Sequence, residues 1–199
     1  MKGMNKSGEE NRSVRNTKKK LRDGLLRLME KKPINEISVK ELTELVDVNR
    51  GTFYFHYTDI YDMLHKMEEE FFRNFSETLI AMFPLQIERR SDIAYYYLSA
   101  IFSVLGENRE FCKIMLGPNG DMQFVEQIKQ LVSDTCSHIW YEAAPDSDSA
   151  KFEMYNAFII NGCIGIFQKW LNDEGSDSPE EISQLAATII HASLRPSIS

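Results

Sequence analysis

The sequence predicts an all-helical fold, in which an N-terminal three-helix domain is joined by a long helix to a larger C-terminal helical domain. Apolar residues recur at spacings of three and four along most of the 199 residues, which is the period of helices packed on one face. No segment sustains the apolar and polar alternation of a half-buried strand. Short runs that contain glycine or proline separate the helical stretches. We therefore expect helices and no sheet.

The charge of the chain is unevenly distributed. Lys and Arg number 23 against 30 Asp and Glu, a formal net charge of -7 that by itself argues against a nucleic-acid partner. Residues 1–57, however, carry 13 Lys and Arg against 8 Asp and Glu. A basic front part on an acidic remainder suggests that the front part alone meets a polyanion.

The cysteines and the apolar runs exclude several classes of protein. Cys112, Cys136 and Cys163 are far apart and form no C-x-x-C pair, so we expect buried free thiols and neither a zinc site nor a disulfide. The N-terminus lacks the apolar core of a signal peptide. The most apolar run, 157–167, is shorter than the roughly 20 residues of a membrane span. We expect a cytoplasmic protein with no membrane partner.

The N-terminal part is expected to begin with a disordered arm over residues 1–12, which are polar. A first helix follows from about Val14, because Leu21 and Leu25 fall on one apolar stripe while lysines and arginines occupy the other faces. Pro33 ends this helix.

Two short helices joined by a tight turn come next. Ser38 caps the second helix, and Glu41 three residues later completes the pattern of a capping box. Residues 47–49 form the turn, and Asn49 caps a third helix that ends near Phe55.

The predicted N-terminal domain spans residues 13–57, and residues 58–199 form the second domain. Thr58 and Asp59 cap a long fourth helix that runs to about residue 83, where Pro84 ends it. The further helices are expected over 91–105, 107–116, 121–142, 150–173 and 179–193.

Residues 38–57 are predicted to form a helix-turn-helix, because the turn between their helices allows only a steep crossing. With Phe53 turned toward the core, Gly51 lies almost opposite on the exposed face. A glycine inside a helix costs about 1 kcal/mol relative to alanine, which is explained if the backbone approaches another surface, such as the DNA major groove. Alternatively, Gly51 closes a loop while Tyr54 and Phe55 pack inside. The basic arm before the first helix favours the DNA interpretation.

The stretch 48–57 resembles the DNA-binding domain of the TetR family of bacterial one-component regulators. It contains the run Gly51-Thr52-Phe53-Tyr54 and then His56, which matches the family pattern G-T-x-Y-x-H. The resemblance covers about residues 14–64 and implies a DNA-binding protein.

The resemblance also implies roles for single residues. Arg50 is expected to contact bases, and Lys40 is expected to anchor the DNA backbone from the second helix. Thr52, Tyr54 and His56 are expected to contact phosphates or base edges. The expected DNA-binding residues are Lys18, Lys19, Lys20, Lys40, Asn49, Arg50, Gly51, Thr52, Tyr54 and His56.

One position departs from the family pattern. Members of the family usually have a lysine at the start of the fourth helix that touches phosphate, whereas this chain has Ile60. The departure puts one phosphate contact in doubt and suggests weaker binding or compensation by the lysines at 18–20. Asn49 stands where the family favours serine, and both residues cap helices.

The second domain, from residue 65 to residue 199, resembles the C-terminal domain of the same family in length and helix number. The likeness is to a subgroup with an N-R-E-F stretch, here residues 108–111, and an L-G-P-N-G-D stretch, here residues 116–121. The resemblance implies a domain that dimerises and usually binds a small effector, but it selects no ligand.

The helix over 150–173 is apolar on most of its sides, which a surface helix of a monomer cannot be. Two such helices from each of two subunits would form a four-helix interface. The alternative is that both helices belong to the core of a monomer. The expected interface residues are Tyr155, Ile159, Gly162, Cys163, Ile166, Trp170, Ile182, Leu185, Ala186 and Ile189.

Aromatic and methionine residues between the helices of the second domain are candidates for an effector pocket, although such residues belong to the core more often than to a ligand site. The candidates are Phe71, Phe75, Met82, Tyr96, Phe102, Met115, Phe124, Trp140 and Phe167.

The sequence thus favours a dimeric, ligand-responsive repressor that binds a pseudo-palindromic DNA duplex. The alternative is a ligand-independent co-activator, or a DNA-binding module controlled by a protein partner. Metalloprotease, hydrolase and phosphate-loop patterns are missing, so no enzyme and no cofactor are expected. A metal site at His65 with Glu68 or Glu69 is possible by spacing, but a solvated helix face explains these residues better, so no metal is expected.

Overall fold

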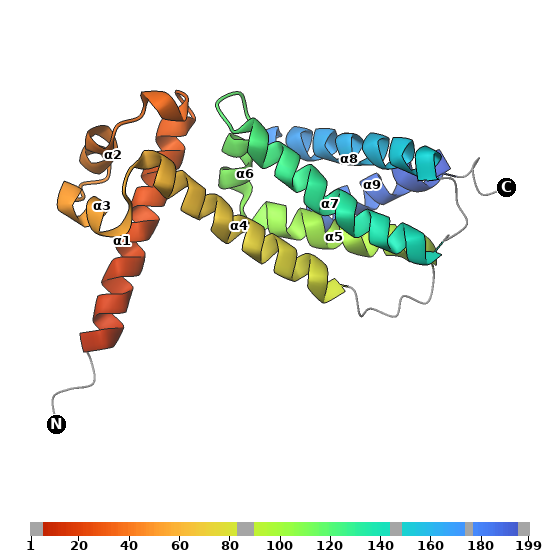
Figure 1. Cartoon of the computed structure of the whole chain (residues 1–199), viewed down its shortest axis with the longest axis horizontal. Helices are drawn as coiled ribbons and strands as arrows, with labels where there is room; N and C mark the ends of the chain where they lie inside the picture. Colours follow the sequence, from red (N-terminus) through yellow and green to blue (C-terminus); the bar gives the residue numbers. More distant parts are fainter. Residues whose placement is uncertain (1–5, 83–89, 144–148, 174–176, 195–199) are drawn as a thin grey trace. The chain divides into compact units, whose positions relative to one another are not determined.

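The computed structural model describes residues 6–82, 90–143, 149–173 and 177–194, and all regular structure within these ranges is helical (Figure 1). The predicted all-α fold is confirmed. The elements are α1 (Lys6–Met29), the 3-10 helix η1 (Ile34–Glu36), α2 (Val39–Leu45), α3 (Arg50–His56), α4 (Ile60–Met82), α5 (Arg90–Glu107), α6 (Arg109–Met115), α7 (Met122–Ala143), α8 (Ser149–Asn172) and α9 (Pro179–Leu194).

The chain divides into two compact units. The first unit comprises Met1–Glu70 and Gly117–Gly120, and the second comprises Phe71–Leu116 and Asp121–Ser199. The helix α4 starts in the first unit and continues into the second. In the described part of the chain, no helix combines the length and the apolarity needed to cross a bilayer.

The first helix starts earlier than the sequence pattern indicated. It begins at Lys6 rather than near Val14, so it includes part of the segment expected to be a disordered arm. The apolar stripe starts only at Leu21, and a stripe marks where a helix packs rather than where it begins. The basic residues before that stripe are therefore placed on a helix.

Close approach of α1 to α2 fixes the core of the first unit. Leu21, Leu25, Leu42 and Phe53 are fully buried in it. A methyl group on Gly24 would collide with the side chain of Val46. The missing side chain at this position lets the two helices pack without a gap.

Local hydrogen bonds set the ends of α2. The backbone N–H of Glu41 donates to Ser38 Oγ at 3.2 Å, which confirms the predicted cap. The pKa of Glu41 is lowered, first by its hydrogen bond from Lys32 and to a smaller extent by the backbone of Ser38. After α2 the chain reverses through Asp47, whose φ of 52° lies in the left-handed region that Asp tolerates better than most residues.

Aromatic rings fill the second unit. One cluster contains Phe71, Phe75, Phe111 and Phe124. The ring centroids of its contacting pairs are 5.2 to 5.7 Å apart. Within this unit α5 packs on α9, and α8 packs on α6, α7 and α9. Helix α9 starts with a full capping box and then Pro179: Glu181 N donates to Ser178 Oγ at 3.2 Å, and Ser178 N donates to Glu181 Oε2 at 2.8 Å.

Candidate nucleic-acid interface

The helix α3 presents an outward face that the core does not use. Asn49 caps it, since its Oδ1 accepts a hydrogen bond from Gly51 N at 2.7 Å. Phe53 is fully buried and Tyr57 is buried, as the helical projection predicted. Arg50, Gly51 and the two aromatic residues that follow Phe53 are exposed.

The alternative in which Tyr54 and Phe55 pack inside is wrong. The two side chains are 52% and 81% exposed. The Tyr54 ring meets the Phe53 ring edge to face, with 5.5 Å between their centroids and 88° between their planes. Its hydroxyl therefore stands free to reach a partner, and the helix is supported without it.

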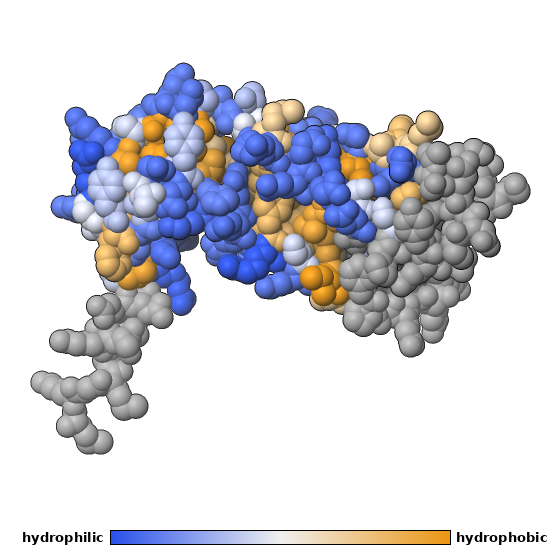
Figure 2. All heavy atoms as spheres, viewed as in Figure 1, coloured by the Kyte–Doolittle hydropathy of each residue, from blue (hydrophilic) through white to orange (hydrophobic). Residues whose placement is uncertain are grey.

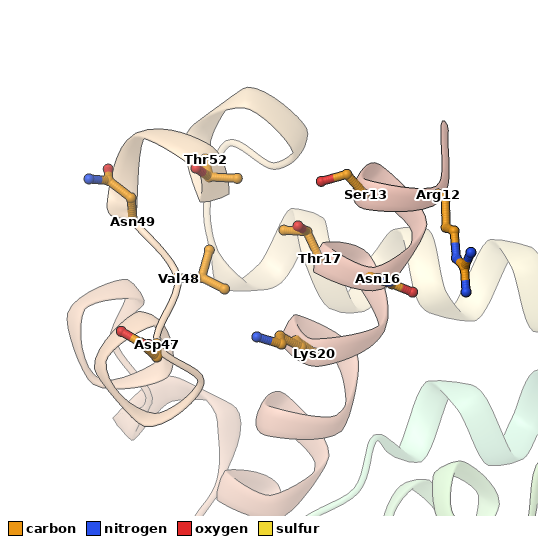
Figure 3. A pocket seen from close by; sticks show the side chains of 9 residues that line it. All are labelled: Arg12, Ser13, Asn16, Thr17, Lys20, Asp47, Val48, Asn49 and Thr52. Atoms are coloured by element: carbon orange, nitrogen blue, oxygen red, sulfur yellow. The ribbon is translucent and has the colours of Figure 1, made fainter. Parts of the chain in front are cut away.

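A polar cleft lies in the first unit between α1 and the segment from the end of α2 to the start of α3 (Figure 3). Its volume is about 560 Å³. Ser13, Thr17 and Lys20 of α1 point toward the opposite wall (Figure 3). The lining residues are Arg12, Ser13, Asn16, Thr17, Lys20, Asp47, Val48, Asn49 and Thr52.

The lining of this cleft suits a phosphodiester group. The Lys20 ammonium can neutralise phosphate charge, and the hydroxyls of Ser13, Thr17 and Thr52 can donate hydrogen bonds to its oxygens, whereas the Arg12 side chain points away from the opposite wall (Figure 3). Three of the predicted residues, Lys20, Asn49 and Thr52, thus line the same cleft. Asp47 is the one acidic group among the lining residues.

Lys18 of α1 acts electrostatically on the end of α3. The pKa of His56 is lowered, mainly by burial and also by the positive charge of Lys18. Lys18 and His56, both predicted DNA-binding residues, thus influence each other electrostatically. Lys19 is exposed as well.

The C-terminal end of α3 is held by Lys66 of α4. Its Nζ donates to His56 O at 3.3 Å and to Asp62 Oδ2 at 2.9 Å, and lies 5.5 Å from the Tyr57 ring centroid. A cation near the last carbonyls of a helix is favourable because of the helix dipole. Lys66 thus links the end of α3 to α4.

The position that departs from the family pattern is part of the core. Ile60 is 4% exposed, so it offers nothing to a phosphate. The next residue, Tyr61, is exposed and carries a hydroxyl. Lys40 is exposed on α2, where its Nζ lies 3.9 Å from Glu44 Oε1.

Sequence reasoning did not single out Arg12, Ser13 and Thr17 as site residues. They precede the apolar stripe of α1 and lie far from α3 in the chain, so no local pattern marks them. Basic and hydroxyl-bearing residues at spacings of three and four, from Ser13 through Thr17 to Lys20, were the available signal.

The predicted effector residues lie in the core of the second unit. Phe102 and Phe167 meet edge to face at 5.6 Å, in a cluster apart from that of Phe71, Phe75 and Phe124. Tyr96 is exposed, and the side chains of Met82 and Trp140 lie outside the described residues. The residues that are buried are Phe71, Phe75, Phe102, Met115, Phe124 and Phe167.

The predicted interface residues fall into three groups. Trp170, Ile182 and Ala186 are buried against their own chain, because apolar periodicity marks a buried face without saying which helix covers it. Leu185, Ile189 and Gly162 are exposed, and Tyr155, Ile159, Cys163 and Ile166 are intermediate.

An apolar stripe on α8 extends this exposed group. Met154 and Phe158 are 75% and 64% exposed and lie at four-residue spacing before Gly162 and Gly165. A methyl group added at either glycine would meet nothing within 4 Å. These four residues, with Leu185 and Ile189 of α9, are here called the α8–α9 face.

Neither Cys112 nor Cys163 forms a disulfide; Cys112 is buried as expected, Cys163 is only half-buried, and the side chain of Cys136 lies outside the described residues. His65 pairs with Glu69 at 3.3 Å on an exposed helix face. Among the residues that the structure describes, no three His, Cys, Asp or Glu side chains gather as a metal site would require.

The chain matches a family model described as the transcriptional regulator C-terminal region of TetR type, over residues 92–192, just over half of its length. It is 24% identical over 168 residues to YxbF of Bacillus subtilis strain 168, an uncharacterised HTH-type transcriptional regulator. That match covers 82% of this chain but 42% of the relative, so the chain spans less than half the length of the curated relative it matches.

Two solved structures share the fold. A TetR transcriptional regulator from Streptococcus agalactiae 2603V is 18% identical with a TM-score of 0.58, and the match covers 92% of this chain and 98% of that one. The fatty acid degradation regulator FadR from Bacillus halodurans is 10% identical with a TM-score of 0.67, with 89% and 96% covered.

Proposed function

Because the chain belongs to the TetR family of transcriptional regulators, we propose that it acts as a homodimeric repressor that binds a pseudo-palindromic DNA duplex and is released by a small effector. The α3 helix of each subunit enters the major groove. The cleft beside it holds a phosphate of the DNA backbone.

The observation that carries the proposal is the continuity between α3 and the cleft. Arg50 and Tyr54 are exposed on α3, while Asn49 and Thr52 of the same segment line the cleft with Lys20. Base-reading groups thus stand directly beside phosphate-binding groups. This is the arrangement that a major-groove helix requires, since phosphate contacts position the helix and base contacts give specificity.

The α8–α9 face supports a homodimer. Met154, Phe158, Leu185 and Ile189 expose apolar surface on two neighbouring helices of one unit. Exposed apolar side chains on helices that pack on each other mark an interaction surface more often than isolated ones do. A two-fold protein matches the symmetry of a palindromic duplex, so a second copy is the proposed occupant.

An effector of this protein is proposed to be apolar. The buried side chains described in the second unit are apolar except for Asn156 and Ser183, and both of these are hydrogen-bonded, Asn156 Nδ2 to Ser133 Oγ at 2.8 Å. A polar ligand inside this core would lose its hydration without compensation.

A DNA-bound dimer blocks polymerase by occupancy alone, so we propose repression as the mode of regulation.

The proposed function is tested by selecting duplexes from a random pool with the wild-type protein and measuring affinity by fluorescence anisotropy at several salt concentrations. We expect two symmetric half-sites and an affinity that falls steeply with salt, since each displaced counterion adds to the slope. Arg50→Ala is expected to remove the preference for the selected sequence.

Arg73→Ala serves as the matched control, because Arg73 is also exposed but lies on α4 in the second unit. It is expected to keep the sequence preference. Selection that enriches no sequence, or equal losses for the two arginine variants, contradicts the proposal.

A further inference from the structure

We propose that Phe55 determines part of the sequence specificity by contacting the 5-methyl group of thymine in the major groove. The inference rests on the proposed DNA-binding function and names one of the base-reading groups of that site. It assigns a role to a residue that the family pattern leaves unspecified, between Tyr54 and His56.

The fold does not explain the position of Phe55. At 81% it is the most exposed large apolar side chain among the described residues. Its ring meets the edge of the adjacent His56 ring at 5.0 Å and 80°, and the core is completed by Phe53 on the opposite side of the helix. Leaving a phenyl ring in water forgoes the free energy of its burial, so a partner that covers the ring gains binding energy.

The backbone beside Phe55 is bare. Gly51 precedes it by four residues, so the two positions lie on the same face of α3. A methyl group at Gly51 would meet only Asn49 Oδ1, at 3.2 Å. Tyr54 flanks the glycine at three-residue spacing. Two rings thus border a stretch of helix that a base edge can approach closely.

The chemistry of this face selects thymine. Among Arg50–His56, the one permanently charged side chain is that of Arg50, which matches the acceptors of guanine. A phenyl ring has no donor or acceptor for the other base edges. Of the four bases only thymine presents a methyl group in the major groove, and apolar side chains recognise it by contact.

The surroundings of Phe55 favour DNA over a second protein copy. Arg50 lies on the same helix, and the charge of Lys18 is felt at the neighbouring His56. Two copies that met through this face would bring like charges together. A duplex instead supplies phosphates for the cations and methyl groups for the ring. Figure 2 shows hydrophobic residues among hydrophilic ones on the part of the surface formed by α1 to α3.

The test replaces thymines of the selected duplex, one symmetric pair at a time, by deoxyuridine, which lacks only the methyl group. With wild-type protein, deoxyuridine at one of these symmetric pairs is expected to lower the affinity about fourfold for each half-site. This is the effect of removing one buried methyl group. With Phe55→Ala, binding to the thymine duplex falls by a similar factor and the same replacement has no further effect.

Two variants serve as controls. Phe55→Leu keeps an apolar side chain and is expected to keep the methyl dependence. Leu45→Ala removes an exposed apolar side chain from α2 and is also expected to keep it. Should Phe55→Ala fail to melt like the wild type, Phe55→Gln, which suits a helix and lacks the apolar ring, replaces it.

The possible outcomes separate the two proposals. A wild-type protein that selects a duplex, but whose deoxyuridine penalties all persist in Phe55→Ala, overturns the role of Phe55 and leaves the DNA-binding function standing. A wild-type protein that selects no duplex overturns both.

Discussion

Arg109 of α6 closes the C-terminal end of α8 around Trp170. Its guanidinium carbon lies 4.7 Å from the Trp170 ring centroid, and its Nη2 donates to Trp170 O at 2.8 Å and to Asp173 O at 3.0 Å. The indole of Trp170 in turn donates from Nε1 to Asp177 O at 2.9 Å. One arginine thus donates to the carbonyls of Trp170 and Leu171 in the last turn of α8 and of Asp173 just beyond it.

We expect Arg109→Ala to lower the free energy of unfolding by about 2–4 kcal/mol, since charged hydrogen bonds and a cation–π contact are lost together. Arg109→Lys should restore little of this, because an ammonium cannot reproduce the planar fork. Urea unfolding at fixed protein concentration measures both. A loss below about 0.5 kcal/mol, the usual effect of an exposed substitution such as Arg73→Ala, would contradict the role of Arg109.

Adjacent positions on α3 should respond in opposite ways. Phe53→Ala truncates a fully buried ring and is expected to cost about 3–5 kcal/mol of stability. Tyr54→Ala removes an exposed side chain, so helicity and melting should remain while specific DNA binding is lost. Circular dichroism melting and anisotropy distinguish the two. A Tyr54→Ala protein that unfolds would show that Tyr54 supports the fold.

A leucine at Gly162 should act on the dimer and not on the single chain. Nothing lies within 4 Å of a methyl group at this position, and leucine favours helices more than glycine does. Against a partner helix, the added volume typically costs about 1–3 kcal/mol, and a two-fold interface contains the substitution twice.

Light scattering over a range of concentrations measures this effect. We expect a dimeric wild type, a weakened dimer for Gly162→Leu and a smaller change for Gly162→Ala. A monomeric wild type would remove the proposed interface, and a fully dimeric Gly162→Leu would move it away from Gly162.

The pH dependence of DNA binding reports on His56. Burial and Lys18 lower its pKa below the usual 6.5 in the free protein. A DNA phosphate beside the imidazole would raise that pKa, so binding takes up a proton at any pH between the two values. Affinity should therefore increase as the pH falls through this window, and the slope should vanish in His56→Gln.

Stability should move in the opposite direction. The pKa of His56 is lower in the folded chain than in the unfolded one. The free energy of unfolding is therefore highest above about pH 6.5, and it decreases as the pH falls toward the folded pKa, because the unfolded chain takes up the proton first. Thermal melting without DNA checks the direction of this change in stability.

For the DNA-binding prediction, an affinity that does not change with pH would place His56 away from the phosphate.

Much of the fold follows from local sequence signals. Ser38 and Asn49 cap helices because their side chains bond to nearby backbone groups, and Phe53 faces inward because the helical period requires it. The start of α1 at Lys6 was not predictable in the same way, since its early turns carry no apolar stripe.

Contacts between distant parts of the chain could not be predicted from the sequence. Arg109 and Trp170 are 61 residues apart, and no periodicity pairs an arginine with the end of another helix. Likewise, Trp170 was expected at an interface. The apolar pattern shows that a position is buried, but it does not show which helix covers it. The cleft beside Lys20 exists only once α1 packs against the turn that precedes α3.

The central claim, that α3 reads bases in two half-sites, is tested most directly by photo-crosslinking. A benzoylphenylalanine placed at Tyr54 should crosslink to bases at two symmetric positions of the selected duplex, one helical turn of about 10–10.5 base pairs or a multiple of it apart. The same probe at Tyr96, which is exposed on α5 in the second unit, should give no base crosslinks. Base crosslinks from Tyr96 and none from Tyr54 would contradict the account.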